Sequence, residues 1–361
     1  MAKQRIEYID AMRGFTMILV VFAHVCHFCF GDSRMGYNVI FILFRLPCFF
    51  MLSGWLFEPA SRNSFKTVAR HKAMVQLVPT FIFLLLLAPP PEFFHQLGAL
   101  KGGYWFTFVL FEFFILYMLI ARAGKYWTPI LAFLITIASF IYARYYDSIK
   151  TSSESYQLLI INALGFLSVT TWRLFLFFYI GTWIRRHFDA FIRWTSKPAV
   201  FFLICAAFFL IASTSHKDYI WYEMFRYYAG GVSGMIMIFA FFRFLYISPF
   251  IHHSCSIFHL PSSIFHLPSS IIPLPSSLFH HPSSILQYVG TRTLDIYLLH
   301  YFFLPRFLMD YAPQLYAYDS RLLEFIIIMA ISLIVLVLCL ITSYVIRLSP
   351  FLGHYLFGVK Y

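Results

Sequence analysis

The sequence predicts an all-α integral membrane protein with about ten transmembrane helices, in one domain over residues 1–361. Of its 361 residues, 61% are hydrophobic and only 12% are charged, whereas about 25% of residues are charged in an ordinary soluble domain. Apolar runs of about 20 residues recur along the chain, and each can cross a hydrocarbon core about 30 Å thick. A transmembrane barrel would show alternation over about ten residues instead. These observations exclude a soluble domain, a barrel and a disordered chain.

The apolar windows place ten spans, with ends defined to within about two to four residues. The spans cover residues 11–30, 37–57, 75–91, 103–121, 128–146, 159–184, 199–215, 219–246, 286–309 and 323–347. The basic N-terminal stretch leads into the first span without a small-residue cleavage site. We therefore expect a retained first helix and not a signal peptide.

The distribution of Lys and Arg predicts the orientation of these spans. With a cytoplasmic N-terminus, fifteen basic residues fall in inner segments and six in outer loops. This bias places both termini in the cytoplasm, and it accounts for the net charge of +12 without nucleic acid, for which no binding motif is present. The other six basic residues lie in spans or at their edges and need partners: Arg13, Arg45, Arg173, Arg226, Arg292 and Arg306.

Residues 256–283 form a tandem seven-residue repeat, SIFHLPS, SIFHLPS, SIIPLPS and SLFHHPS. Proline in every unit forbids a continuous helix, so we expect a disordered cytoplasmic loop within the domain. The histidines of the repeat could bind a metal; the alternative is that the repeat arose by a simple in-frame duplication and has no such role. Of the six cysteines, only Cys26 and Cys29 have CxxC spacing, and both lie in the apolar first span, so we expect free thiols filling a core and no metal site.

Ionisable side chains inside the first span are candidate functional groups, because each costs about 2.5 to 3.5 kcal/mol on insertion scales. Asp10 and Arg13 lie three residues apart and can pair on one helix face. Arg13 and His24 share a face but are eleven positions apart, or about 16 Å along the helix axis. They cannot contact each other directly.

Counting depth at about 1.5 Å per residue brings four ionisable groups to one layer. From the outer surface, His24 lies about 10 Å down, Arg45 about 12 Å, Glu112 about 13 Å and His300 about 9 Å. Alternatives remain for each residue. His24 and His300 can be hydrogen-bonded core groups, and Arg45 and Glu112 can form a purely structural ion pair.

Four motifs resemble the bacterial membrane acyltransferase 3 family. They are YIDAMRGFTMILVVFAHV, with Arg13 and His24 separated by ten residues; RLPCFFMLSGWLF from Arg45; GGYWFTFVLFEFFILYML with Glu112; and TLDIYLLHYF with His300. Ten spans also fit that family, so the resemblance covers nearly the whole chain except the repeat. It implies transfer of an acyl group, commonly acetyl from cytoplasmic acetyl-CoA, to hydroxyls of cell-surface or periplasmic glycans.

The resemblance implies that His24, Arg13, Arg45 and Glu112 form the catalytic site. We place Asp10, His300 and Ser53 among the supporting residues. Family members often carry paired arginines ahead of the third helix that engage CoA, but this chain reads FKTVARHKAMVQLVP. Arg70 and Lys72 are therefore the candidate donor-binding residues, with Met74 and Val75 where a second arginine is expected.

The residue types fit O-acylation. A neutral His24 could accept the proton of an acceptor hydroxyl, a contribution of about 10² to 10⁴ in rate, and Arg45 could stabilise the tetrahedral oxyanion. Glu112 could orient the imidazole or pair with Arg45. No GxSxG motif occurs, and Ser53 lies about 24 Å from the outer side, too deep for the His24 layer. Direct transfer from the thioester is the preferred hypothesis.

These arguments predict a multi-pass O-acetyltransferase of the bacterial cytoplasmic (inner) membrane that modifies a polysaccharide. Its partners would be acyl-CoA as donor substrate, a carbohydrate or glycolipid acceptor and the lipid bilayer, with no bound cofactor and no nucleic acid. Homo-oligomerisation stays open. The alternative is a transporter or flippase for a glycan or lipid-linked precursor, because intramembrane Arg, Glu and His also line substrate pathways. A structural subunit or receptor would leave the buried charges unexplained.

Overall fold

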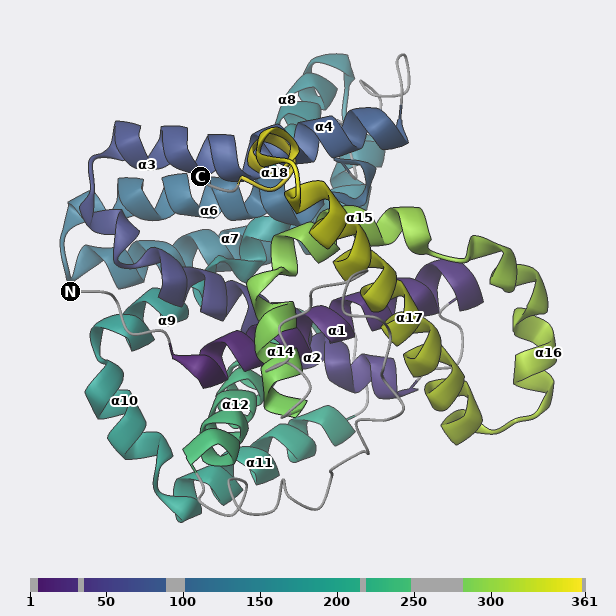
Figure 1. Cartoon of the computed structure of the whole chain (residues 1–361). Coiled ribbons are helices and arrows are strands. Elements are labelled where there is room, and N and C mark those ends of the chain that lie inside the picture. The colour runs from purple at the N-terminus through teal and green to yellow at the C-terminus, as the bar shows by residue number, and fades with distance from the viewer. Residues whose placement is uncertain (1–5, 32–35, 89–100, 215–218, 248–281, 359–361) are drawn as a thin grey trace.

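A computed structural model describes residues 6–31, 36–88, 101–214, 219–247 and 282–358, and these residues are almost entirely helical. Helix α1 (Glu7–Phe30) lies at the centre of the bundle (Figure 1), and 67% of its most apolar window is buried. The helices with the largest interfaces on α1 are α2 (Gly36–Phe57), α12 (Ile220–Ile247), α14 (Pro282–Thr291) and α17 (Arg321–Arg347). The first predicted span, with its ionisable groups, is therefore the core of the protein.

Within the described residues, seven helices are long and apolar enough to cross a membrane, or nine if each of two bent pairs counts as one span. The straight candidates include α1, α2, α12, α17, α6 (Trp105–Ile120) and α7 (Trp127–Ser152). The seventh, residues 65–87, combines α3 (Phe65–Lys72), a π-helical turn at Ala73–Leu77 (η2) and α4 (Val78–Leu87). An all-α multi-pass membrane fold is confirmed, whereas the number of ten spans and the orientation of the termini stay predictions.

Two predicted spans are broken. Residues 159–184 fold as α8 (Ser155–Phe166), η5 (Val169–Leu174) and α9 (Phe175–Arg186), with a 45° bend. The break follows Ser168, whose φ of +51° lies in the left-handed region and cannot continue a right-handed helix. Residues 286–309 form α14 and then α15 (Thr293–Phe303), separated at Arg292. An apolar window alone does not distinguish one long helix from two short ones.

The remaining elements are short segments and one further bent pair. The bent pair is α10 (Phe188–Thr195) and α11 (Pro198–Ser213), which meet at 83°. The short segments are η1 (Ala60–Arg62), η3 (Lys101–Gly103), η4 (Ala121–Ala123), η9 (Arg306–Tyr311), α16 (Ala312–Ala317) and α18 (Pro350–Phe357). Of these, η3 matters most for function, because it lies at the start of the segment that carries the third of the four family motifs and leads directly into α6.

Glycines let two helix pairs approach at backbone distance. A Cβ atom on Gly14 of α1 would lie 2.0 Å from the Leu286 carbonyl oxygen of α14, and one on Gly290 would lie 1.8 Å from the Asp10 carbonyl oxygen. Helices α2 and α9 pack in the same reciprocal way through Gly54 and Gly181. Small residues allow such contacts in membranes, where packing replaces the hydrophobic effect as the force between helices. These contacts fix α1 against α14, and therefore the site against its neighbours.

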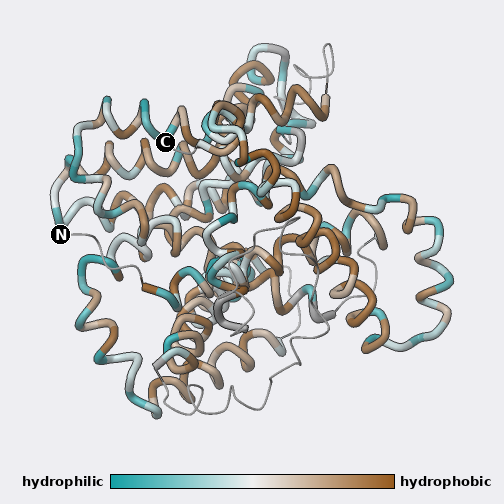
Figure 2. Tube along the Cα trace, in the orientation of Figure 1, coloured by the Kyte–Doolittle hydropathy of each residue, from teal (hydrophilic) through white to brown (hydrophobic). Residues whose placement is uncertain are grey.

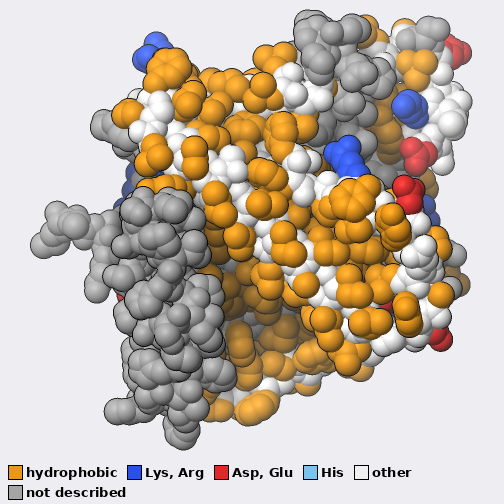
Figure 3. Space-filling model, turned by 45° about the vertical axis from the view of Figure 1, so that its right-hand side comes forward, with side chains coloured by type: hydrophobic (Ala, Val, Ile, Leu, Met, Phe, Trp, Pro, Cys, Tyr) orange, Lys and Arg blue, Asp and Glu red, His pale blue; other side chains and the backbone are white. Residues whose placement is uncertain are grey.

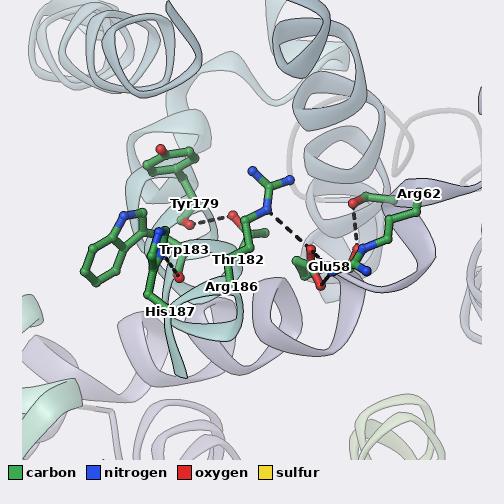
Figure 4. Close-up of polar contacts among 8 residues, drawn as sticks. Glu58, Arg62, Tyr179, Thr182, Trp183, Arg186 and His187 are labelled. Atoms are coloured by element: carbon green, nitrogen blue, oxygen red, sulfur yellow. Dashed lines mark hydrogen bonds and ion pairs between the residues drawn. The ribbon is translucent and has the colours of Figure 1, made fainter. Parts of the chain in front are cut away.

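A buried carboxylate links the C-terminal ends of α2 and α9. Glu58, only 3% exposed, lies between Arg62 and Arg186 (Figure 4), with Nη2 of Arg62 at 3.0 Å and Nε of Arg186 at 3.3 Å from its Oε1. Breaking such a pair leaves an uncompensated buried charge. Glu58 therefore joins the end of α2 to the end of α9.

The surface fits a lipid environment. Apolar residues run along the lengths of the helices and hydrophilic ones gather near helix ends and connections (Figure 2), and hydrophobic side chains cover much of one face (Figure 3). On α17, Leu322, Ile326 and Ile334 are more than half exposed, as expected of a lipid-facing helix.

Four of the predicted core cysteines are buried in the core: Cys26, Cys29, Cys48 and Cys339. Cys255 and the repeats lie outside the described residues, except Pro282 and Ser283, which begin α14.

Candidate active site

Two histidines from opposite ends of the sequence form one hydrogen-bonded pair. Nδ1 of His24 on α1 lies 2.7 Å from Nε2 of His300 on α15, and the two rings stack at 4.8 Å between centroids. His300 is fully buried, whereas His24 is partly exposed. The predicted common layer of these two residues is therefore a direct contact.

The hydrogen bonds of the pair assign its tautomers. Nδ1 of His300 lies 3.1 Å from the Ile296 carbonyl oxygen; since a carbonyl can only accept, this nitrogen carries the hydrogen. In a neutral imidazole the other nitrogen then has a lone pair, so Nε2 of His300 accepts a hydrogen bond from Nδ1 of His24. Nε2 of His24 is left as the basic nitrogen.

Tyr301 lies beside that basic nitrogen. Its hydroxyl is 3.4 Å from Nε2 of His24 and donates to the Gly103 carbonyl oxygen at 3.1 Å. A phenol has one hydrogen, so donation to Gly103 leaves the lone pair of His24 available. Tyr297, one helical turn earlier, also donates to Gly103 and accepts from the backbone N–H of Phe106. The two tyrosines thus fix η3 and the start of α6 against α15.

His24 opens into a cavity of about 270 Å³, which we call the histidine cavity. Arg45 of α2 lines it and is 8% exposed. Its Nη1 atom donates to Oδ1 of Asn38 at 3.2 Å and to the Leu19 carbonyl oxygen at 3.4 Å. The structure therefore brings His24 and Arg45 to one cavity, as their depths predict. The lining residues are Met17, Val20, Ala23, His24, His27, Asn38, Ile42, Arg45, Leu46, Phe49, Trp105, Phe106 and Tyr297.

Arg13 opens into a second cavity of about 180 Å³, which we call the arginine cavity. Its Nη1 atom pairs with Oδ1 of Asp10 at 3.2 Å, which confirms the predicted pair, and Nη2 donates to Oγ1 of Thr293 at 2.9 Å. Lys72 lines the same cavity, with Nζ 4.3 Å from the Phe114 ring centroid. The side chains lining this cavity are Arg13, Phe49, Leu52, Ser53, Leu56, Lys72, Val75, Gln76, Phe106, Thr107, Leu110, Phe114, Thr293, Leu294 and Tyr297.

A π-helical turn delivers another polar group to the arginine cavity. Gln76 lies in η2, and its Oε1 atom is buried without a hydrogen-bond partner. An unsatisfied buried carbonyl costs about 1 to 3 kcal/mol, so it favours a ligand that donates a hydrogen bond. Single π-helical turns are frequent at functional sites.

Three aromatic residues, Phe49, Phe106 and Tyr297, line both cavities. Phe49 and Phe106 pack edge to face at 4.8 Å, and Phe106 packs against Tyr297 at 5.6 Å. The histidine and arginine cavities are therefore adjacent, with one aromatic wall between them.

Glu112 belongs to a different cluster from His24 and Arg45. Its Oε2 atom accepts from Nε1 of Trp172 at 2.8 Å, and Lys101 and Ser168 lie beside it. Nζ of Lys101 donates to Oγ of Ser168 and to the Phe166 carbonyl oxygen, each at 2.6 Å. Burial lowers the pKa of Lys101, and the Glu112 carboxylate acts in the opposite direction. Neither open alternative for Glu112, orienting His24 or pairing with Arg45, appears among its contacts.

The remaining predicted residues are divided between cavity and surface. Ser53 lines the arginine cavity and donates to the Phe49 carbonyl oxygen at 2.8 Å, away from His24 as its depth predicts. Arg70 is exposed on α3 and lines neither cavity, unlike Lys72.

Sequence reasoning missed Tyr297, Tyr301 and Gln76. The spacing of Tyr297, His300 and Tyr301 at i, i+3 and i+4 does place them on one helix face, a pattern that could have identified the two tyrosines. The π-helical turn that carries Gln76 leaves no comparable pattern in the sequence.

Comparison with known proteins assigns the family. A family model described as an acyltransferase domain, that of the acyltransferase 3 family, matches residues 6–344, so the match includes all the residues of both cavities. No curated protein and no solved structure matches the chain. Together with the helical membrane fold, the match over nearly the full length shows that this chain is a membrane acyltransferase and belongs to the acyltransferase 3 family.

Proposed function

We propose that this protein transfers an acyl group, acetyl in the first instance, from cytoplasmic acyl-CoA to a hydroxyl of a cell-surface or periplasmic carbohydrate. The observation that carries the proposal is the pair of adjacent cavities with different chemistry. One presents the basic nitrogen of His24, and the other presents the cations Arg13 and Lys72. Two substrates can thus approach one reaction centre from two sides.

His24 acts as the general base. With Nδ1 engaged by His300, Nε2 takes the proton of the acceptor hydroxyl as that oxygen attacks the thioester carbonyl. This attack forms the carbon–oxygen bond of the tetrahedral intermediate, and collapse of the intermediate restores the carbonyl of the new ester and breaks the carbon–sulfur bond. The proton held by His24 then passes to the departing CoA thiolate, so the base is regenerated.

Arg45 stabilises the oxyanion of the tetrahedral intermediate. Its guanidinium lines the histidine cavity and is held by Asn38 and Leu19. Groups fixed in this way need little reorganisation as charge develops, which makes them effective in a site that excludes bulk water.

The arginine cavity receives the CoA side of the donor. Arg13 and Lys72 supply positive charge for a phosphate-bearing molecule, and the unsatisfied Oε1 of Gln76 can accept a hydrogen bond from an amide of the pantetheine arm. The thioester reaches the His24 side past Phe49, Phe106 and Tyr297, which line both cavities.

Transfer proceeds without an acyl-serine intermediate. Ser53, which lines the arginine cavity, already donates to the Phe49 carbonyl oxygen. A nucleophile needs a base within hydrogen-bond reach, and the bonds of His24 are to His300 and Tyr301. Direct attack by the acceptor hydroxyl is therefore the simpler path.

The proposal includes an orientation in the bacterial cytoplasmic membrane, with both termini in the cytoplasm. The positive-inside bias of the sequence supports it. In this orientation the start of α1, with Arg13, faces the cytoplasmic pool of acyl-CoA. The end of α1, with His24, faces the periplasmic acceptor.

The test is transfer of radiolabelled acetyl from acetyl-CoA to cell-envelope glycans by the purified protein. Label on glycan hydroxyls supports O-acetyl transfer, and a comparison with labelled succinyl-CoA reports the acyl preference. If folded protein transferred no label from either donor, the proposal would fail in favour of a transporter of a glycan or lipid-linked precursor.

A further inference from the structure

A third cavity lies apart from the two reaction cavities. It has a volume of about 400 Å³ and lies between α7, η5 and α12. It shares no lining residue with the histidine or arginine cavity. Its lining consists of Phe140, Ala143, Arg144, Arg173, Glu223, Arg226 and Tyr227. The proposed acyl transfer uses none of these residues.

The third cavity carries an excess of positive charge. Three arginines line it against one carboxylate, and Glu223 pairs with Arg144, with Oε2 and Nε 3.1 Å apart. Among the described residues, no carboxylate pairs with Arg173 or Arg226. The Nε atom of Arg226 is buried without a hydrogen-bond partner. Within the described ranges, the cavity thus holds two guanidinium groups, those of Arg173 and Arg226, that no carboxylate pairs with.

Such an arrangement favours an oxyanion ligand. Arg226 is partly buried, with its Nε atom unpartnered, whereas Arg173 is exposed. Arginine keeps its charge in proteins and cannot relieve burial by losing a proton, so the partly buried Arg226 in a membrane helix bundle favours an anionic partner. The planar guanidinium donates two parallel hydrogen bonds to phosphate or carboxylate oxygens. A phosphate group carries one to two negative charges, which matches the excess from Arg173 and Arg226.

The surroundings of the cavity point to a phosphate attached to a lipid. The cavity residues lie in the second half of α7 (Arg144) and in the first two turns of α12 (Glu223 and Arg226). Trp221 and Phe225, beside them on α12, are 71% and 59% exposed. Exposed aromatic side chains at helix ends mark the interface where lipid headgroups lie. A ligand there can place its phosphate in the cavity and its hydrocarbon chain against α12.

We propose that this cavity binds the phosphate group of a membrane lipid through Arg173 and Arg226. The same chemistry is offered by a bulk phospholipid, such as phosphatidylglycerol, and by a polyprenyl phosphate of the kind that carries glycans. The proposal stands on the charges and position of the cavity and does not rest on acyl transfer.

The experiment measures lipid binding to the full-length protein in detergent by native mass spectrometry. The probes are phosphatidylglycerol, a polyprenyl phosphate and diacylglycerol, which has no phosphate. Wild-type protein is compared with the double variant Arg173→Gln/Arg226→Gln. The matched control is Arg193→Gln, which removes one charge from an exposed position on α10.

We expect the wild type and Arg193→Gln to bind a phosphate-bearing lipid and not diacylglycerol. The double variant should bind that lipid at least about tenfold more weakly, since charge-assisted hydrogen bonds are lost. Preference for phosphatidylglycerol would identify a bulk lipid, and preference for the polyprenyl phosphate a glycan carrier. Equal binding by wild type and double variant, or equal binding of diacylglycerol, would overturn the proposal.

A second measurement, competition by soluble phosphate compounds, uses only the wild-type protein and so does not depend on the folding of the double variant. Glycerol phosphate should displace the bound lipid from the wild-type protein, whereas glycerol at the same concentration should not. Lipid retention that is indifferent to glycerol phosphate at every concentration would contradict a phosphate site.

Discussion

Nδ1 of His24 and Nε2 of His300 are 2.7 Å apart, although 275 residues separate them in the chain. The bond joins the C-terminal part of α1 to α15, and it leaves Nε2 of His24 as the nitrogen that can accept a proton. His300 lines neither cavity itself but contacts His24, which does, so its effect on catalysis passes through His24. It is a positioning residue.

Replacing His300 should therefore reduce turnover more than donor binding. For His300→Asn we expect kcat to fall about 10- to 100-fold, less than the full contribution of about 10² to 10⁴ of a general base. The KM for acetyl-CoA should change little, because the arginine cavity is intact. Steady-state kinetics with purified protein check this, with His187→Asn on the surface as control. A rise in KM with unchanged kcat would contradict the positioning role.

The two predicted donor-binding residues differ in position and should differ in effect. Lys72 lines the arginine cavity, whereas Arg70 is exposed on α3. We expect Lys72→Met to raise the KM for acetyl-CoA about tenfold, as for loss of one charge-assisted contact. Arg70→Met should raise it less. Titration of acetyl-CoA against both variants makes the comparison, and a larger effect at Arg70 would move the donor entrance to the surface of α3.

The close approach of α1 and α14 predicts a loss of stability for Gly14→Ala. The added Cβ atom would lie 2.0 Å from the Leu286 carbonyl oxygen, so the helices must separate. Overpacking of this kind costs about 1 to 3 kcal/mol or more, and we expect a lower melting temperature in detergent.

Gly165→Ala is the matched control for that substitution. A Cβ atom there meets only the Tyr146 hydroxyl at 3.9 Å, and alanine has a helix propensity better than glycine by about 1 kcal/mol. Its melting temperature should be unchanged or higher. Equal melting temperatures for Gly14→Ala and wild type would show that the α1–α14 contact is looser than described.

Lys101 predicts a specific dependence of stability on pH. Burial lowers its pKa in the folded state below the ordinary value of 10.5, so between the two values the unfolded chain binds more protons. The stability of wild type relative to Lys101→Met should therefore rise as pH increases through the window below 10.5. Thermal melting at about pH 7 and 9.5 measures this difference, with Lys197→Met on the surface as control. A difference that shrinks toward high pH would be the contrary result.

Sequence reasoning anticipated those parts of the site that depend on spacing along one helix or on depth. The three-residue spacing of Asp10 and Arg13 gives their ion pair, and the matched depths of His24 and His300 anticipate their contact. The depth argument did not predict the partners of Glu112. A residue's depth gives its position along the membrane normal but not the direction in which its side chain points. Glu112 points to Trp172, on a segment that hydropathy had placed inside one continuous span.

The fold shows the same limit. Hydropathy located α1, α2 and α17 closely, since each is one long apolar helix. It did not find the break at Arg292 between α14 and α15, because averaging over a window that includes the apolar stretch 296–304 hides the polar residues Thr291, Arg292 and Thr293. That break sets where α15 begins, and hence where Tyr297, His300 and Tyr301 stand relative to His24.

The central claim is that His24 is the base of the transfer reaction, and acetyl transfer by purified His24→Ala tests it most directly. Folding is checked by thermal melting, and His24→Gln, which retains a polar side chain, is measured alongside. Both variants should transfer acetyl from acetyl-CoA at least about 10²-fold more slowly than wild type. Transfer at the wild-type rate by folded His24→Ala would contradict the account.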